Sequence, residues 1–205
     1  EKNLAVELLK KLIAEQVSVY RRSNIVKSEK FSELIQGAMN RYLNGMLTNE
    51  EVIQELLKLA KEIADANAEG EKLGLTADEL AFYDALTKPQ AIKDFYEHDE
   101  LIAITKELTD LLRKNRTIDW QKKESARAGM RRLVKRLLKK YKYPPEGMDD
   151  AIKTVMSQCE MWVDNMDDVN LDDKNSILIY EMKPETTLSL VAEEIAPYGV
   201  VEKSE

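Results

Sequence analysis

The chain has 205 residues, 43% of them hydrophobic, and carries a formal net charge of −7. This apolar content is enough for one good core or two small ones, which excludes a chain disordered throughout. Glycine and proline are scarce, while Leu, Lys, Glu and Ala dominate. The composition therefore favours an all-α fold, an irregular multi-helix bundle, over a turn-rich β architecture.

Cysteine content and hydropathy bear on the compartment. The single cysteine, Cys159, cannot form an internal disulfide, and no charged-then-apolar leader opens the chain at Glu1. No apolar run approaches the roughly 20 residues needed to cross a bilayer. We expect a soluble cytoplasmic protein with no membrane partner. A helical pattern already under way at Glu1, without Met, indicates a fragment of a longer protein or a processed product.

Apolar residues recur with helical spacing from the start of the chain. They predict a first helix from Leu4 that fades near Tyr20, and a second from about Ser28. Asn44 and Gly45 are expected to end the second helix as a C-terminal cap pair.

Two pairs with capping-box spacing mark the next helix starts. Thr48 and Glu51 open a third helix, for which Gly70 is the predicted stop. Thr76 and Glu79 open a short fourth helix through about Leu86, since the following Pro89 disfavours continuation. A fifth helix is expected over about 99–113.

A sixth, cationic helix is predicted over 117–141. On a helical wheel its apolar residues fall in an arc of about 140°, with cations covering the other side. The apolar arc comprises Ala126, Met130, Leu133, Val134, Leu137, Leu138 and Tyr141. Such a helix packs on one face only.

Pro144 and Pro145 end the cationic helix, and Pro145 also suits the first position of a seventh helix. We divide the chain into a helical domain, 1–163, and an acidic linker and tail, 164–205. Within the tail, Ile177 to Tyr180 is interpreted as either a short strand or an exposed apolar patch, and a weak helix is expected after Pro184.

The search for catalytic motifs finds little. The glycines never form a phosphate-binding loop, so nucleotide hydrolysis by this chain alone is not expected. The sole histidine, His98, is interpreted as a solvated loop residue, and Cys159 as a small buried hydrophobe. One His and one Cys do not suffice for the common zinc sites. A nuclease motif around Glu181 lacks an upstream acidic partner.

Charge is strongly segregated along the chain. Residues 111–143 hold thirteen Lys or Arg against two acids, a net charge of +11, so the remainder carries −18. Three interpretations stay open: a protein docking surface, a DNA-binding face on which Trp120 stacks or contacts phosphate, or a face neutralised by the chain's own acids. The candidate docking residues are Lys123, Arg127, Arg131, Arg132, Lys135, Arg136, Lys139 and Lys140.

Three stretches resemble one protein family. They are SEKFSELIQGAMNRYLNGMLTNEEVIQELLKLAKEI, LTADELAFYDAL and RKNRTIDWQKKESARAGMRRLVKRLLKKYKYPP. Together they look like the C-terminal helical region of the motor and restriction (R) subunit of type I restriction enzymes, over about Lys2 to Val163. Two positions depart from the family pattern: Lys142 stands where glycine is frequent, and Gly129 where a larger residue is usual.

The resemblance implies a role without catalysis in this segment. In that family an N-terminal nuclease domain cuts DNA and two helicase-like domains hydrolyse ATP, and the helical region follows them. The implied role is to anchor the subunit on the methyltransferase (modification) subunits and to brace its remaining domains. ATP and Mg are implied for the parent endonuclease, and no cofactor, metal or catalytic residue for this segment. The alternative is a stand-alone helical module that binds double-stranded DNA through 117–141.

Overall fold

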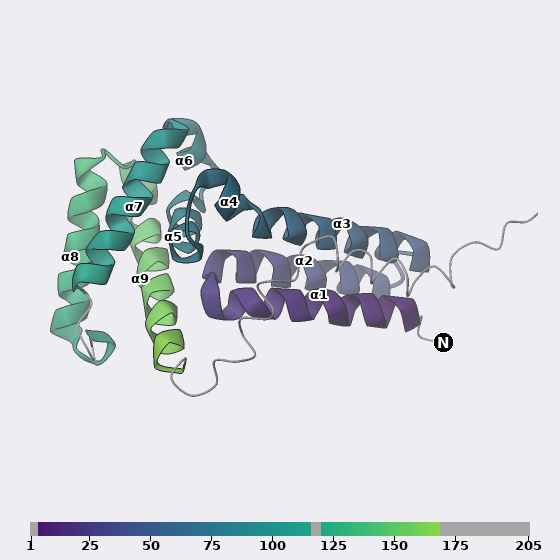
Figure 1. Cartoon of the computed structure of the whole chain (residues 1–205). Helices are drawn as coiled ribbons and strands as arrows, with labels where there is room; N and C mark the ends of the chain where they lie inside the picture. The colour runs from purple at the N-terminus through teal and green to yellow at the C-terminus, as the bar shows by residue number, and fades with distance from the viewer. Residues whose placement is uncertain (1–3, 116–119, 169–205) are drawn as a thin grey trace, which may run out of the picture. The chain divides into compact units, whose positions relative to one another are not determined.

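The computed structural model describes residues 4–115 and 120–168. Figure 1 shows that these residues form helices throughout, with no strand among them, which confirms the all-α prediction. The helices are α1 (Leu4–Ser23), α2 (Ile25–Leu43), α3 (Asn49–Asn67), α4 (Glu69–Leu73), α5 (Ala77–Thr87), α6 (Gln90–Phe95), α7 (His98–Asn115), the 3-10 helix η1 (Trp120–Lys122), α8 (Glu124–Lys140) and α9 (Pro145–Asp168).

The described residues divide into two compact units. The first unit contains residues 4–19 and 29–68, which are most of α1 and α2 and all of α3. The second unit contains residues 20–28, where α1 ends and α2 begins, together with the described residues after 68. The prediction of one helical domain ending at Val163 did not foresee this division.

The first unit is built on one apolar row from each helix. The buried residues are Val6, Leu9, Ile13 and Val17 of α1, Phe31, Ile35, Ala38 and Met39 of α2, and Val52, Leu56, Leu59 and Ile63 of α3. Their spacing of three and four residues places each set on one helix face. Burial of these side chains is the main source of stability for three helices that would be marginal alone.

Both predicted capping boxes are present. Thr48 Oγ1 accepts a hydrogen bond from Glu51 N at 3.2 Å, and Glu51 Oε2 accepts one from Thr48 N at 2.7 Å. Thr76 and Glu79 repeat the exchange at 3.3 and 2.8 Å. These pairs fix the starts of α3 and α5, because each satisfies two backbone donors that lack a partner in the helix.

The prediction that Gly70 ends the third helix is wrong. Helix α3 ends at Asn67, and Gly70 lies inside α4, where it is buried. A Cβ at this position would lie 3.2 Å from the Leu75 carbonyl oxygen and 3.4 Å from Leu80 Cδ2. Glycine is therefore needed here for close packing rather than for a helix stop.

The core of the second unit draws on α5, α7, α8 and α9. Helix α5 contacts α7 and α9, and α8 contacts both α7 and α9. Every residue of α5 from Leu80 to Thr87 is buried, so this part of the helix has no solvent-exposed polar face. Phe82 of α5 meets Trp162 of α9 edge to face, with ring centroids 5.6 Å apart.

Several predicted boundaries need correction. The second helix begins at Ile25 rather than Ser28, and α9 continues to Asp168, past Val163. The cationic helix does not begin at Thr117: residues 116–119 lie outside the described residues, Trp120–Lys122 form η1, and α8 begins at Glu124. The expected strand at 177–180 and helix after Pro184 also lie outside the described residues.

The corner between α8 and α9 is closed by tyrosines. Tyr143 Oη donates to the Leu86 carbonyl oxygen at 2.7 Å, and Tyr96 Oη donates to the Tyr141 carbonyl oxygen at 2.8 Å. Burial raises the pKa of both phenols to about 12. The corner thus ties α8 to α5 and α6 through the backbone.

The end of α8 is a Schellman cap with lysine in the position that favours glycine. Tyr143 N donates to the Leu138 carbonyl and Lys142 N to the Lys139 carbonyl, at 2.9 and 3.1 Å. Lys142 has φ of 55°, whereas the equivalent position after α2 is Gly45, with φ of 71°. The left-handed backbone conformation is unfavourable for residues that have a Cβ atom, whereas glycine adopts it without this cost in free energy.

We predict that Lys142→Gly raises the free energy of unfolding by about 0.5–1 kcal/mol, because it relieves the left-handed strain. Urea denaturation followed by circular dichroism measures the change. The matched control is Gly45→Lys, which installs the strained residue at the α2 cap and should lower the stability by a similar amount. A Lys142→Gly variant less stable than the wild type contradicts the prediction.

Candidate functional site

The structure confirms the predicted division of α8 into an apolar face and a cationic face. Met130, Val134, Leu137 and Leu138 are buried in the core of the second unit. The cations at 131, 132, 135, 136, 139 and 140 are exposed, as is Lys123 just before the helix, whereas Arg127 is half-buried. Gly129 lies within α8, and a Cβ there would meet nothing within 4 Å, so no close contact requires glycine at this position.

Cations at the flanks of this face are paired with the chain's own acids. Lys140 lies 2.7 Å from Glu107 of α7. On the α9 side, the partners are Arg127 with Glu160 at 2.7 Å and Lys135 with Asp149 at 3.8 Å, and within α8 Arg131 lies 3.8 Å from Glu124. Hence neutralisation by the chain's own carboxylates accounts for half of the eight predicted docking residues.

Glu107 accepts hydrogen bonds from two residues at the end of α8. Hydrogen bonds from Lys140 and from the Tyr141 hydroxyl hold the pKa of Glu107 below its ordinary value. The hydrogen bond to Glu107 raises the pKa of Lys140. Both groups therefore stay charged near neutral pH, and Lys140 and Glu107 remain an ion pair on the α7 side of the cationic face.

The middle of the face is different. Arg132, Arg136 and Lys139, here called the central row, are exposed and make no ion pair with the described part of the chain. Their spacing of four and three residues aligns them along the helix, over about 10 Å. Lys123 is likewise exposed and unpaired there. The central row is therefore positive charge without an ion-pair partner in the described part of the chain, and the docking and DNA interpretations both concern it.

Other residues singled out in the sequence have structural places. Trp120 is 1% exposed, so stacking on nucleic acid, which the sequence suggested, does not fit its position. Cys159 is buried, as predicted. His98 is exposed, as predicted, although it is the first residue of α7 rather than part of a loop. No cluster of three or more His, Cys, Asp or Glu suited to a metal ion occurs among the described residues.

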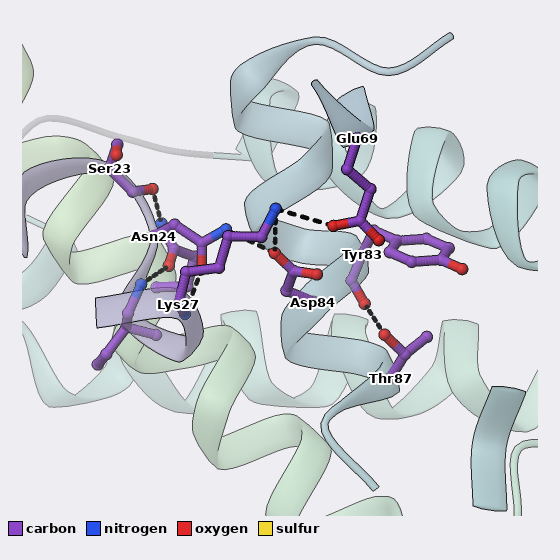
Figure 2. Close-up of polar contacts among 9 residues, drawn as sticks. Ser23, Asn24, Lys27, Glu69, Tyr83, Asp84 and Thr87 are labelled. Atoms are coloured by element: carbon purple, nitrogen blue, oxygen red, sulfur yellow. Dashed lines mark hydrogen bonds and ion pairs between the residues drawn. The ribbon is translucent and has the colours of Figure 1, made fainter. Parts of the chain in front are cut away.

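The second unit also contains a buried polar cluster, shown in Figure 2, at the break between α1 and α2. Asn24 caps α2: its Oδ1 accepts from Lys27 N at 3.0 Å, while its Nδ2 donates to Asp84 Oδ2 of α5 at 2.6 Å. Lys27 Nζ lies 3.0 Å from Glu69 Oε2 and 3.5 Å from Asp84 Oδ2. Asn24, Lys27 and Asp84 are each buried.

Gln158 of α9 satisfies the backbone at the same break. Its Oε1 accepts from Ile25 N at 2.9 Å, and its Nε2 donates to the Ser23 carbonyl at 2.8 Å. One side-chain amide thus bonds the backbone on both sides of Asn24. Because Gln158 is itself buried, water does not readily replace it.

Charge compensation in this cluster is incomplete. Burial raises the pKa of Asp84, and Lys27 and Asn24 oppose the rise only in part. Burial also raises the pKa of Tyr83, beside it. None of the site residues predicted from the sequence belongs to this cluster. One signal in the sequence could have indicated that Asp84 is buried. It stands within the largely apolar stretch from Phe82 to Leu86, where a solvent-exposed helix face is not expected.

Comparison with known proteins decides the family. Residues 1–165 match the family described as type I restriction enzyme HindI endonuclease subunit-like, C-terminal. The chain belongs to this family. The type I restriction enzyme HindI endonuclease subunit of Haemophilus influenzae is 42% identical over 159 residues, which are 78% of this chain and 15% of that protein. No solved structure matches the chain.

A second relative is less similar in sequence. It is the protein of Methanocaldococcus jannaschii that is provisionally named type I restriction enzyme MjaIXP endonuclease subunit. The identity is 33% over 150 residues, which are 73% of this chain and 14% of that protein. The chain therefore spans about one seventh of the length of these type I subunits. No helix among the described residues is long and apolar enough to span a membrane.

We predict that Gln158→Met lowers the free energy of unfolding by about 1–3 kcal/mol, because at nearly constant volume it leaves the Ile25 N–H and the Ser23 carbonyl, both half-buried, without this buried partner. Urea denaturation measures the loss. The control Gln121→Met removes a hydrogen bond to the Glu160 carbonyl at a half-buried site and should cost less than about 1 kcal/mol. Equal losses in the two variants contradict the role given to Gln158.

A second prediction concerns pH. The pKa of Asp84 is raised above its ordinary value of 3.8, so its contribution favours folding most below that value and is lost as pH rises through the folded-state pKa. The stability of the wild type minus that of Asp84→Asn should therefore decrease from acid toward neutral pH. Urea denaturation of both proteins across pH 3.5–7.5 tests this. A difference that stays flat or increases contradicts the assignment.

Proposed function

We propose that this chain is a non-catalytic assembly module of a type I restriction endonuclease R subunit. It joins the ATP-dependent motor and nuclease to the methyltransferase (modification) subunits. Membership of the C-terminal family over residues 1–165 supports the proposal, together with the named activity of the relatives. The observation that carries it is the central row of α8, which leaves positive charge unpaired on a helix whose other face is fixed in a core.

The contacts that fix α8 in the second unit agree with a role as a docking surface. Its apolar face packs in the core, its end is tied down by Tyr143, and its flanking cations are paired with α7 and α9. A cationic face on a rigid element loses little conformational entropy when a partner binds. The remaining domains of the parent subunit and the modification subunits are the proposed partners.

Duplex DNA is the second candidate partner, and the unpaired cations of the central row are what favours it. A protein that neutralises three phosphates should show an affinity that falls with salt, with a slope in log–log form of roughly −3. The nuclease hypothesis around Glu181 concerns a residue outside the described part of the chain.

The test of assembly is capture of purified modification subunits from the same system by the tagged chain, at about 50 mM and 200 mM salt. We expect capture at the lower salt that weakens at the higher, since exposed ion pairs are screened. Duplex binding is measured in parallel by fluorescence anisotropy. Absence of capture at both salts contradicts the assembly role, and absence of duplex binding at the lower salt removes the DNA alternative.

A further inference from the structure

The central row differs from the rest of α8 in the chemistry it offers a ligand. Two of its three members are arginines, Arg132 and Arg136, whose planar guanidinium groups bind carboxylate or phosphate through paired hydrogen bonds. With Lys139 they form a line about 10 Å long. A matching ligand carries several anionic oxygens along one narrow edge.

Carboxylates flank the central row on both sides. On one side Glu107 of α7 pairs with Lys140. On the other side Asp149 and Glu160 of α9 pair with Lys135 and Arg127. The pairing cations lie on opposite sides of the central row on the helical wheel, so α8 is a basic ridge between two margins whose charges are already balanced.

These margins discriminate between the two classes of polyanion. A helix that enters the major groove of DNA has a phosphate strand on each side. Phosphates placed on both sides of α8 would meet the Lys140–Glu107 pair on the α7 side and the Lys135–Asp149 pair on the α9 side. Because the cations of these pairs already have carboxylate partners, the margins offer the flanking phosphates no net positive charge. The groove is about 12 Å wide and a helix with its side chains about 10 Å, so the strands lie close to these margins.

A single acidic helix does not depend on these margins. Its diameter of about 10 Å allows it to cover the central row alone, and Asp or Glu side chains spaced by three and four residues recur along one of its faces. Arg132, Arg136 and Lys139 have the same spacing. Charge complementarity therefore favours a protein partner that is one helix wide at the contact.

We propose that the central row binds a helix of a modification subunit through a line of Asp or Glu carboxylates, rather than the phosphates of DNA. This inference rests on the proposed function, because it names the chemistry of the partner's surface.

The test is zero-length coupling with a carbodiimide, which joins a lysine amine to a carboxylate only where the two are in direct contact. The chain is mixed with purified modification subunits, coupled and analysed by mass spectrometry. We expect Lys139 linked to an Asp or Glu of a modification subunit, and in Arg136→Lys a second link at residue 136. Lys11, Lys58 and Lys61, exposed lysines of the first unit, are internal controls and should stay unlinked.

Affinity gives an independent readout. The triple variant R132Q/R136Q/K139Q should bind the modification subunits at least about tenfold more weakly at low salt, since three charge pairs are lost. The matched triple K11Q/K58Q/K61Q, with the same change of net charge, should bind within about twofold of wild type. Equal unfolding midpoints of the two triples show that both are folded, and the coupling result on wild type needs no variant.

Three outcomes overturn the inference. They are capture unaffected by the central-row triple, coupling of Lys139 only to carboxylates of its own chain, and duplex DNA that binds wild type but not the central-row triple while protein capture is unchanged. Each leaves the assembly role standing if wild type still captures the modification subunits. If the wild-type chain captures no modification subunit, the proposed function is overturned instead.

Discussion

A helix break inside a protein core is the constraint on which the second unit depends. Where α1 ends and α2 begins, the backbone groups of Ser23 and Ile25 have lost helical partners and face the interior. Buried amides and carbonyls must be hydrogen-bonded, so polar side chains have to enter the core beside them. Gln158 from α9 and Asp84 from α5 do this, and Lys27 with Glu69 balances the carboxylate that enters.

Helix geometry explains which cations of α8 are paired and which are not. Cations near the helix margins reach carboxylates on α7 and α9, as in the interpretation in which the chain's own acids neutralise this face. Cations in the middle of the face are too far around the helix to reach either neighbour. Their lack of partners is thus a consequence of helix geometry, and it gives the proposed docking surface its narrow shape.

Much of the fold follows from local sequence patterns, and the failures have physical causes. Thr-x-x-Glu fixed the starts of α3 and α5 because the capping box is made within four residues. The start of α8 was missed because Trp120 enters the core from a short 3-10 turn. The buried cluster was missed because its contacts are remote: Asn24 and Asp84 lie 60 positions apart, and Ser23 and Gln158 135. The pairing of Arg127, Lys135 and Lys140 was missed for the same reason, because their acidic partners lie on α9 and α7, remote in sequence.

Cys159 has a practical consequence of a different kind. It is the single thiol in the sequence, and it lies fully buried in α9, one residue from Gln158. A thiol in this position reacts with a labelling reagent only when the surrounding structure opens. The rate at which Cys159 is labelled therefore measures how often the second unit opens, and no probe has to be introduced. Because the first unit has no cysteine, the measurement separates the opening of one unit from that of the other.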